Sequence, residues 1–123
     1  MKEEEFWTFL ENALARGKIE QVSASSLGSD DPEIQQAGQY IGGHSLLPEE
    51  YDKIPNDVIV EMGELLLERE VRRQTKEAVM MILAHHGSDE ALSALEKYAE
   101  NPGKGLELYC RFALDECRLW NED

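Results

Sequence analysis

The chain has 123 residues, of which 41% are hydrophobic and 31% charged, a composition typical of one soluble globular domain. Its 12 basic and 26 acidic side chains give a formal net charge of −14. Such a charge repels phosphate backbones and anionic lipid, so we expect neither nucleic acid nor a membrane as partner. Because no apolar run is long enough for a membrane span and residues 3–5 are acidic where a signal peptide is basic, we expect a cytoplasmic protein.

The two cysteines, Cys110 and Cys117, are seven residues apart on one expected helix. That spacing separates them by about 10 Å along the helix axis. A disulfide requires Cα atoms within about 7 Å of each other. We therefore expect two reduced thiols in the core, as is usual in a cytosolic protein.

The first half of the chain predicts four helical segments. Residues 3–15 place Phe6, Phe9 and Leu10 on one stripe, with Trp7 beside it in a core or edge position. A shorter helix is expected over 18–27. Asp31 and Pro32 are a favourable N-cap and first residue for a helix that ends at residues 42–43. After a proline-containing stretch with one turn over 48–53, a helix over 57–67 should bury residues 58, 59, 62, 65 and 66.

The second half predicts three longer helices. The first, over 69–86, has Val79, Ile82 and Leu83 on its buried side. The second, over 89–100, is capped by Ser88 or Asp89, and the third covers about 104–120. No segment has the alternating pattern of a strand, so the sequence predicts an all-α fold.

These helices show an internal repeat. Ile34, Val71 and Leu106 recur at intervals of 37 and 35 residues, and small or apolar residues then coincide one and two turns later. Such a repeat indicates helical hairpins that bury their apolar faces by stacking on their neighbours.

Residues 31–42, which run Asp-Pro, an aliphatic residue, small residues and then Ile-Gly, resemble the HEAT-repeat consensus. Residues 83–95 are similar to the short, lyase-type HEAT pattern, with Gly-x-Asp-Glu-Ala-Leu leading into a helix. The resemblance implies an alpha-alpha superhelix, a short solenoid that fills residues 1–123 as one domain. Residues 1–30 would cap it, 31–68 and 69–101 would form two repeats, and 102–120 a terminal half repeat.

Half of the basic residues fall on expected second helices of hairpins, which the resemblance places on a concave surface. We expect the protein-binding residues among them: Arg72, Arg73, Lys76, Arg111 and Arg118. The alternative is that these cations form structural ion pairs with acids three or four residues away, such as Glu77 and Asp115.

No motif for catalysis, a cofactor or a metal rises above background. His85 and His86 are adjacent, so their side chains point about 100° apart on a helix and are poorly placed to share one ion. The carboxylates on the expected outer faces, including Glu64, Asp115 and Glu116, are interpreted as solvated.

The sequence thus favours a non-enzymatic scaffold or adaptor that binds a protein or peptide through its repeat surface. One alternative, implied only by the resemblance, is a HEAT-like lyase-type enzyme that attaches bilin chromophores. Another is a small acidic subunit that neutralises a basic protein. Leu119 and Trp120, near a polar end, also suggest a homodimer through the C-terminal helix.

Overall fold

A computed structural model describes residues 1–13, 38, 40, 42, 47, 48 and 50–121. Its elements are α1 (Glu3–Ala13), a short 3-10 helix η2 (Tyr51–Lys53), α3 (Asn56–Leu66), α4 (Arg73–His86), α5 (Asp89–Ala99) and α6 (Glu107–Asn121). None of these described residues lies in a strand, so the all-α prediction is confirmed for this part of the chain. The helix expected over 18–27 and most of the one expected over 33–42 fall outside the described residues.

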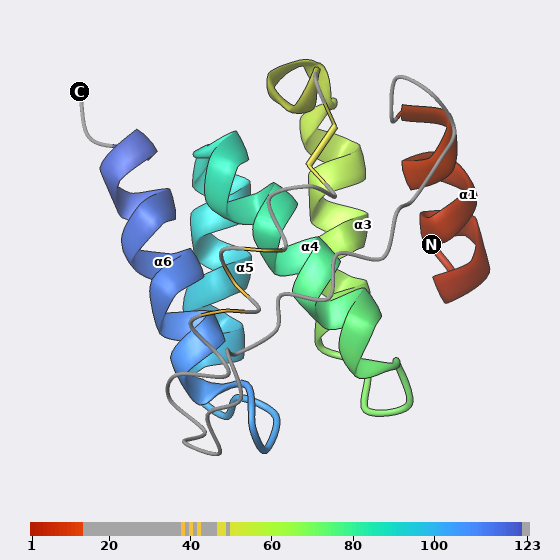
Figure 1. Cartoon of the computed structure of the whole chain (residues 1–123). Coiled ribbons are helices and arrows are strands. Elements are labelled where there is room, and N and C mark those ends of the chain that lie inside the picture. The colour runs from red at the N-terminus through yellow and green to blue at the C-terminus, as the bar shows by residue number, and fades with distance from the viewer. Residues whose placement is uncertain (14–37, 39, 41, 43–46, 49, 122–123) are drawn as a thin grey trace.

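The helices form two layers (Figure 1). α3 packs beside α5, and α4 packs beside α6, while α4 also contacts α3 and α5 from the other layer. α1 lies at the α3 end of the molecule. There the amino group of Met1 is 3.3 Å from a carboxylate oxygen of Glu61 on α3.

α4 is the central helix of the described structure. Residues 78–85 are all buried, so α4 is covered on nearly every side over its last two turns. The sequence pattern predicted a single buried stripe. Met80, Met81 and Ala84 join that stripe because α3, α5 and α6 all pack against α4. None of the described helices is both long and apolar enough to cross a membrane.

α4 begins at Arg73, four residues later than residue 69, where the sequence placed its start. Arg72 is the N-cap and has an extended backbone, with φ −64° and ψ 153°. Its N–H donates to Glu3 Oε2 at 3.0 Å instead of to a preceding helical turn. The contact comes from a residue 69 positions away, so local sequence could not show it.

The starts of α5, α3 and α6 are set by residues close to them in the sequence. α5 is capped by Ser88, one of the two predicted caps, with the Ala91 N–H donating to Ser88 Oγ at 3.1 Å. α3 begins at Asn56, one residue before its predicted start at 57, and Pro55 is the N-cap. α6 begins at Glu107 and not at 104, because Gly105 turns the chain with φ +84° just before it.

Cys110 and Cys117 are free thiols buried along α6, which confirms the predicted reduced core cysteines. Burial raises the pKa of each thiol from its ordinary value of 9.0 to about 11. Both groups are therefore uncharged near neutral pH and behave as core side chains.

Candidate functional site

The cations predicted to bind a partner are mostly occupied by contacts within the protein. Arg72 Nε lies 3.0 Å from Glu3 Oε2, and Arg72 precedes α4 instead of lying on it. Arg73 Nε lies 3.5 Å from Glu77 Oε2, and its Nη2 donates to the Gly105 carbonyl at 2.9 Å. These two arginines at the start of α4 thus hold α1 and the turn before α6 in place.

The other three predicted cations lie farther along the chain. Lys76 Nζ is 5.8 Å from the centre of the Tyr98 ring. Arg118 lies 3.7 Å from Glu96 and 4.0 Å from Asp115. Arg111 is exposed and forms no hydrogen bond or ion pair with another described residue. Binding of a partner by these five residues remains a prediction.

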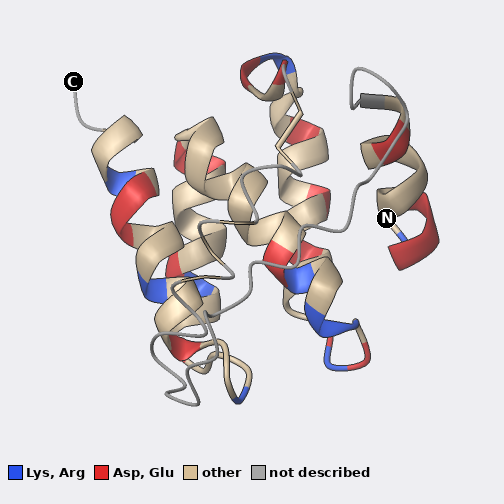
Figure 2. Cartoon of the chain, viewed as in Figure 1, with Lys and Arg blue, Asp and Glu red and all other residues tan. Residues whose placement is uncertain are grey.

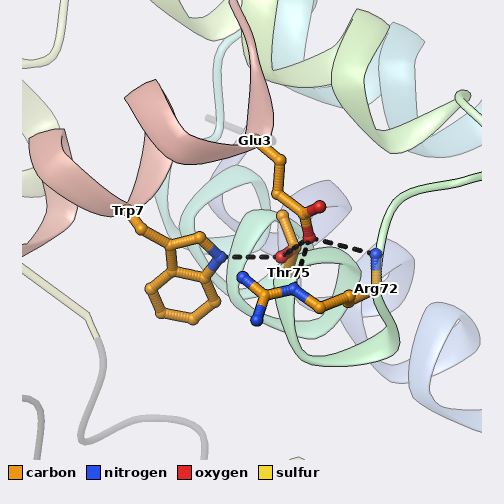
Figure 3. A network of polar contacts seen from close by, with 4 residues as sticks. All are labelled: Glu3, Trp7, Arg72 and Thr75. Carbon is orange, nitrogen blue, oxygen red and sulfur yellow. Dashed lines mark hydrogen bonds and ion pairs between the residues drawn. The ribbon is translucent and has the colours of Figure 1, made fainter.

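Figure 3 shows a polar network that attaches α1 to α4. Trp7 Nε1 donates to Thr75 Oγ1 at 2.7 Å, and the Thr75 hydroxyl donates to Glu3 Oε2. The same carboxylate oxygen accepts from the backbone N–H and the Nε–H of Arg72. The hydrogen bond from Thr75, helped by Arg72, lowers the pKa of Glu3 below its ordinary 4.5. All four residues are used to join two helices, which is a structural role.

A second polar cluster joins α4 to α6. His85 Nε2 lies 2.8 Å from Glu116 Oε2, and the Tyr40 hydroxyl donates to Glu116 Oε1. His85 Nδ1 lies 3.0 Å from the Met81 carbonyl. The prediction that Glu116 is solvated is wrong, because its side chain is only 24% exposed and accepts from groups on two other segments.

The two adjacent histidines, His85 and His86, each have contacts at both ring nitrogens. Both ring nitrogens of His85 are engaged, and the Tyr51 ring packs edge-on at 5.8 Å from the imidazole. The neighbouring His86 is also engaged, with Nδ1 2.8 Å from Ser88 Oγ and Nε2 2.9 Å from the Ile54 carbonyl. Among the described residues no group of three His, Cys, Asp or Glu side chains could hold a metal ion. The two histidines thus fix the end of α4.

A groove of about 390 Å³ runs between α3 and α5, here named the α3–α5 groove. Its floor is made of small residues, because a Cβ on Gly63 would lie only 2.7 Å from the Ala94 Cβ. Val60 on α3 and Leu67, the C-cap residue of α3, flank this floor and stay 45% and 40% exposed. The full lining is Val60, Gly63, Glu64, Leu67, Asp89, Glu90, Ser93, Ala94 and Lys97.

The rim of the α3–α5 groove carries three carboxylates and one ammonium group: Glu64, Asp89, Glu90 and Lys97. Asp89 accepts from Asn121 Nδ2 at 3.1 Å. Glu90 Oε1 is 3.5 Å from Asn56 Nδ2, while its buried Oε2 accepts no hydrogen bond from the described protein. Neither Glu64 nor Glu90 forms an ion pair with a described residue. The rim is thus net acidic and incompletely neutralised.

Sequence reasoning missed this groove, although α3 contained a signal for it. Val60 and Leu67 are apolar but were left out of the predicted inward-facing set of residues 58, 59, 62, 65 and 66. They stand seven residues apart, on one face of the helix, with Gly63 between them. They form a second apolar pair beside the core stripe of α3 and are the signal in the sequence for the groove.

No known protein family, no curated protein and no solved structure matches the chain.

Proposed function

We propose that this protein is a non-enzymatic binding module, an adaptor or scaffold, that holds another protein in the α3–α5 groove. One observation carries the proposal: Val60 and Leu67 remain 45% and 40% exposed on either side of a floor of small residues. Apolar surface left open beside polar residues is typical of a protein interface.

A binding role is favoured over an enzymatic one by the state of the polar groups. His85 and Glu116 are in contact with each other, and His85 Nδ1 also contacts the Met81 carbonyl. Small-molecule sites enclose most of their ligand in a concave pocket, whereas the α3–α5 groove is open along one side. An open groove between two helices suits the side chains of a partner helix.

We further propose that the described helices are stacked hairpins of the HEAT-like kind. The support is that alternate helices lie side by side, α3 with α5 and α4 with α6. In a stack of hairpins each helix packs on the equivalent helix of the next hairpin. The α3–α5 groove would then lie between equivalent helices of successive repeats.

The test is a quantitative pull-down with the purified protein and a double variant, Val60→Ser with Leu67→Ser. Both side chains are partly exposed, so we expect the variant to fold, and circular dichroism checks this. Leu119→Ser is the matched control, because Leu119 is 69% exposed on α6 and does not line the groove. We expect a protein retained by the wild type and by Leu119→Ser and lost from the double variant. Equal retention by all three would overturn the proposed function.

A further inference from the structure

We infer that the α3–α5 groove is built for a basic amphipathic helix, in which lysine or arginine flanks a stripe of apolar side chains. The inference rests on the proposed function and adds the chemistry of the partner. It is carried by the spacing of the apolar residues and by the charge of the rim.

The spacing fits a helix. Val60 on α3 and its C-cap residue Leu67 are seven residues apart, which places them about 10 Å apart along the helix axis. A partner helix repeats its apolar face over the same interval, at positions i, i+3, i+4 and i+7. The floor at Gly63 and Ala94 has no large side chain, so apolar groups of the partner can sit between the two exposed ones. A helix laid along the groove therefore buries both exposed apolar side chains together.

The carboxylates of the rim favour a partner with positive charge. At the rim, the Oε2 atom of Glu90 is buried and accepts no hydrogen bond from the described protein. Glu64 and Glu90 form no ion pair with a described residue, and Lys97 is the one cation in the lining. A partner with lysine or arginine beside its apolar stripe would neutralise this rim, while an acidic partner would be repelled.

The net charge of the whole chain favours the same partner. At −14 the protein attracts a basic segment from a distance, and this raises the rate of encounter. A second copy of the chain carries the same charge and would bring its own acidic surface to this rim. Acidic residues (red in Figure 2) occur on α1, α3, α4, α5 and α6, so each of these helices of a second copy would bring carboxylates with it. A basic helix from a different protein is therefore the occupant that the charges fit.

The experiment uses three synthetic peptides of about 16 residues with leucines at i, i+3, i+4 and i+7. Their remaining positions are lysine in the first, glutamine in the second and glutamate in the third, so only the charge differs. Binding of each fluorescently labelled peptide to the full chain is measured by anisotropy. We expect the lysine peptide to bind at least tenfold more tightly than the glutamine peptide, and the glutamate peptide to show no binding.

Two charge reversals at the rim should act in opposite directions. Glu64→Lys should weaken binding of the lysine peptide about fivefold, and Lys97→Glu should strengthen it by a similar factor. Both side chains are exposed, so the fold should be retained. The control is Glu11→Lys on α1, which changes the net charge from −14 to −12 as Glu64→Lys does, but away from the groove. It should weaken binding less than twofold.

Three results would overturn the inference. The first is equal binding of the lysine and glutamine peptides. If the Val60→Ser, Leu67→Ser double variant then binds neither peptide, the groove still binds proteins, but without selecting for charge. The second is an equal effect of Glu11→Lys and Glu64→Lys, which would show that net charge alone attracts the peptide. The third is no binding of any peptide, in which case the pull-down decides the proposed function independently.

Discussion

The floor of the α3–α5 groove makes a quantitative prediction about Gly63. A Cβ built at this position lies 2.7 Å from the Ala94 Cβ, whereas two carbon atoms in contact normally lie about 3.5–4.0 Å apart. Gly63→Ala therefore forces α3 and α5 apart, and overpacking of this kind costs about 1–3 kcal/mol. Replacing a glycine inside a helix by alanine returns about 1 kcal/mol. The net expectation is a loss of about 0–2 kcal/mol in the free energy of unfolding.

The reciprocal change separates the two contributions. Ala94→Gly alone should lose about 1 kcal/mol, the cost of a glycine inside α5. In the double variant, Gly63→Ala with Ala94→Gly, the steric contact is gone and the two helix-propensity terms cancel. We expect its stability within about 0.5 kcal/mol of the wild type, which is a coupling energy of about 1–3 kcal/mol between the two sites.

Urea unfolding followed by circular dichroism at 222 nm measures all four proteins. The control is Ser93→Gly, one residue from Ala94 on the same helix and exposed. Combined with Gly63→Ala, it should give additive effects, because Ser93 is not the residue that the new methyl group meets. If the double variant with Ala94→Gly is also additive, the close approach of α3 and α5 at Gly63 is refuted.

Three further predictions concern the core and the helix ends. Thr75→Val removes the hydroxyl that donates to Glu3 and should lower the free energy of unfolding by about 1–2 kcal/mol; unchanged urea unfolding would contradict this. The thiols of Cys110 and Cys117 have a pKa of about 11 in the folded protein and about 9.0 in the unfolded chain. The free energy of unfolding should therefore be unaffected by these thiols below pH 8 and should fall as the pH rises from 9 to 11. Replacing both cysteines by alanine should flatten that alkaline decline, and an equal decline in the variant would argue against the thiols. Gly87→Ala, at φ +68°, should cost at least about 2 kcal/mol, and a loss below about 1 kcal/mol would contradict the cap geometry.

The parts of the structure that sequence predicted well depend on local patterns. The period of apolar residues located α3, α5 and the body of α4, and Ser88 could be identified as a cap from the residues next to it. The reduced state of the cysteines followed from helix geometry alone. These features need no knowledge of how helices pair.

The parts that failed depend on contacts between distant residues. Arg72 was placed on a helix because nothing nearby shows that Glu3 binds its N–H. Glu116 was taken as solvated because its partners, His85 and Tyr40, come from other segments. The α3–α5 groove was missed for the same reason, since the approach of Gly63 to Ala94 appears only once α3 and α5 are packed together.

The central claim is that the α3–α5 groove is the binding surface, and backbone chemical-shift mapping tests it most directly. The ¹⁵N-labelled protein is titrated with the lysine peptide, and shifts are followed residue by residue. We predict the largest shifts at Val60, Gly63, Leu67 and Ala94, which line the groove. Shifts confined instead to α6, around Arg111 or the exposed Leu119, would contradict the account.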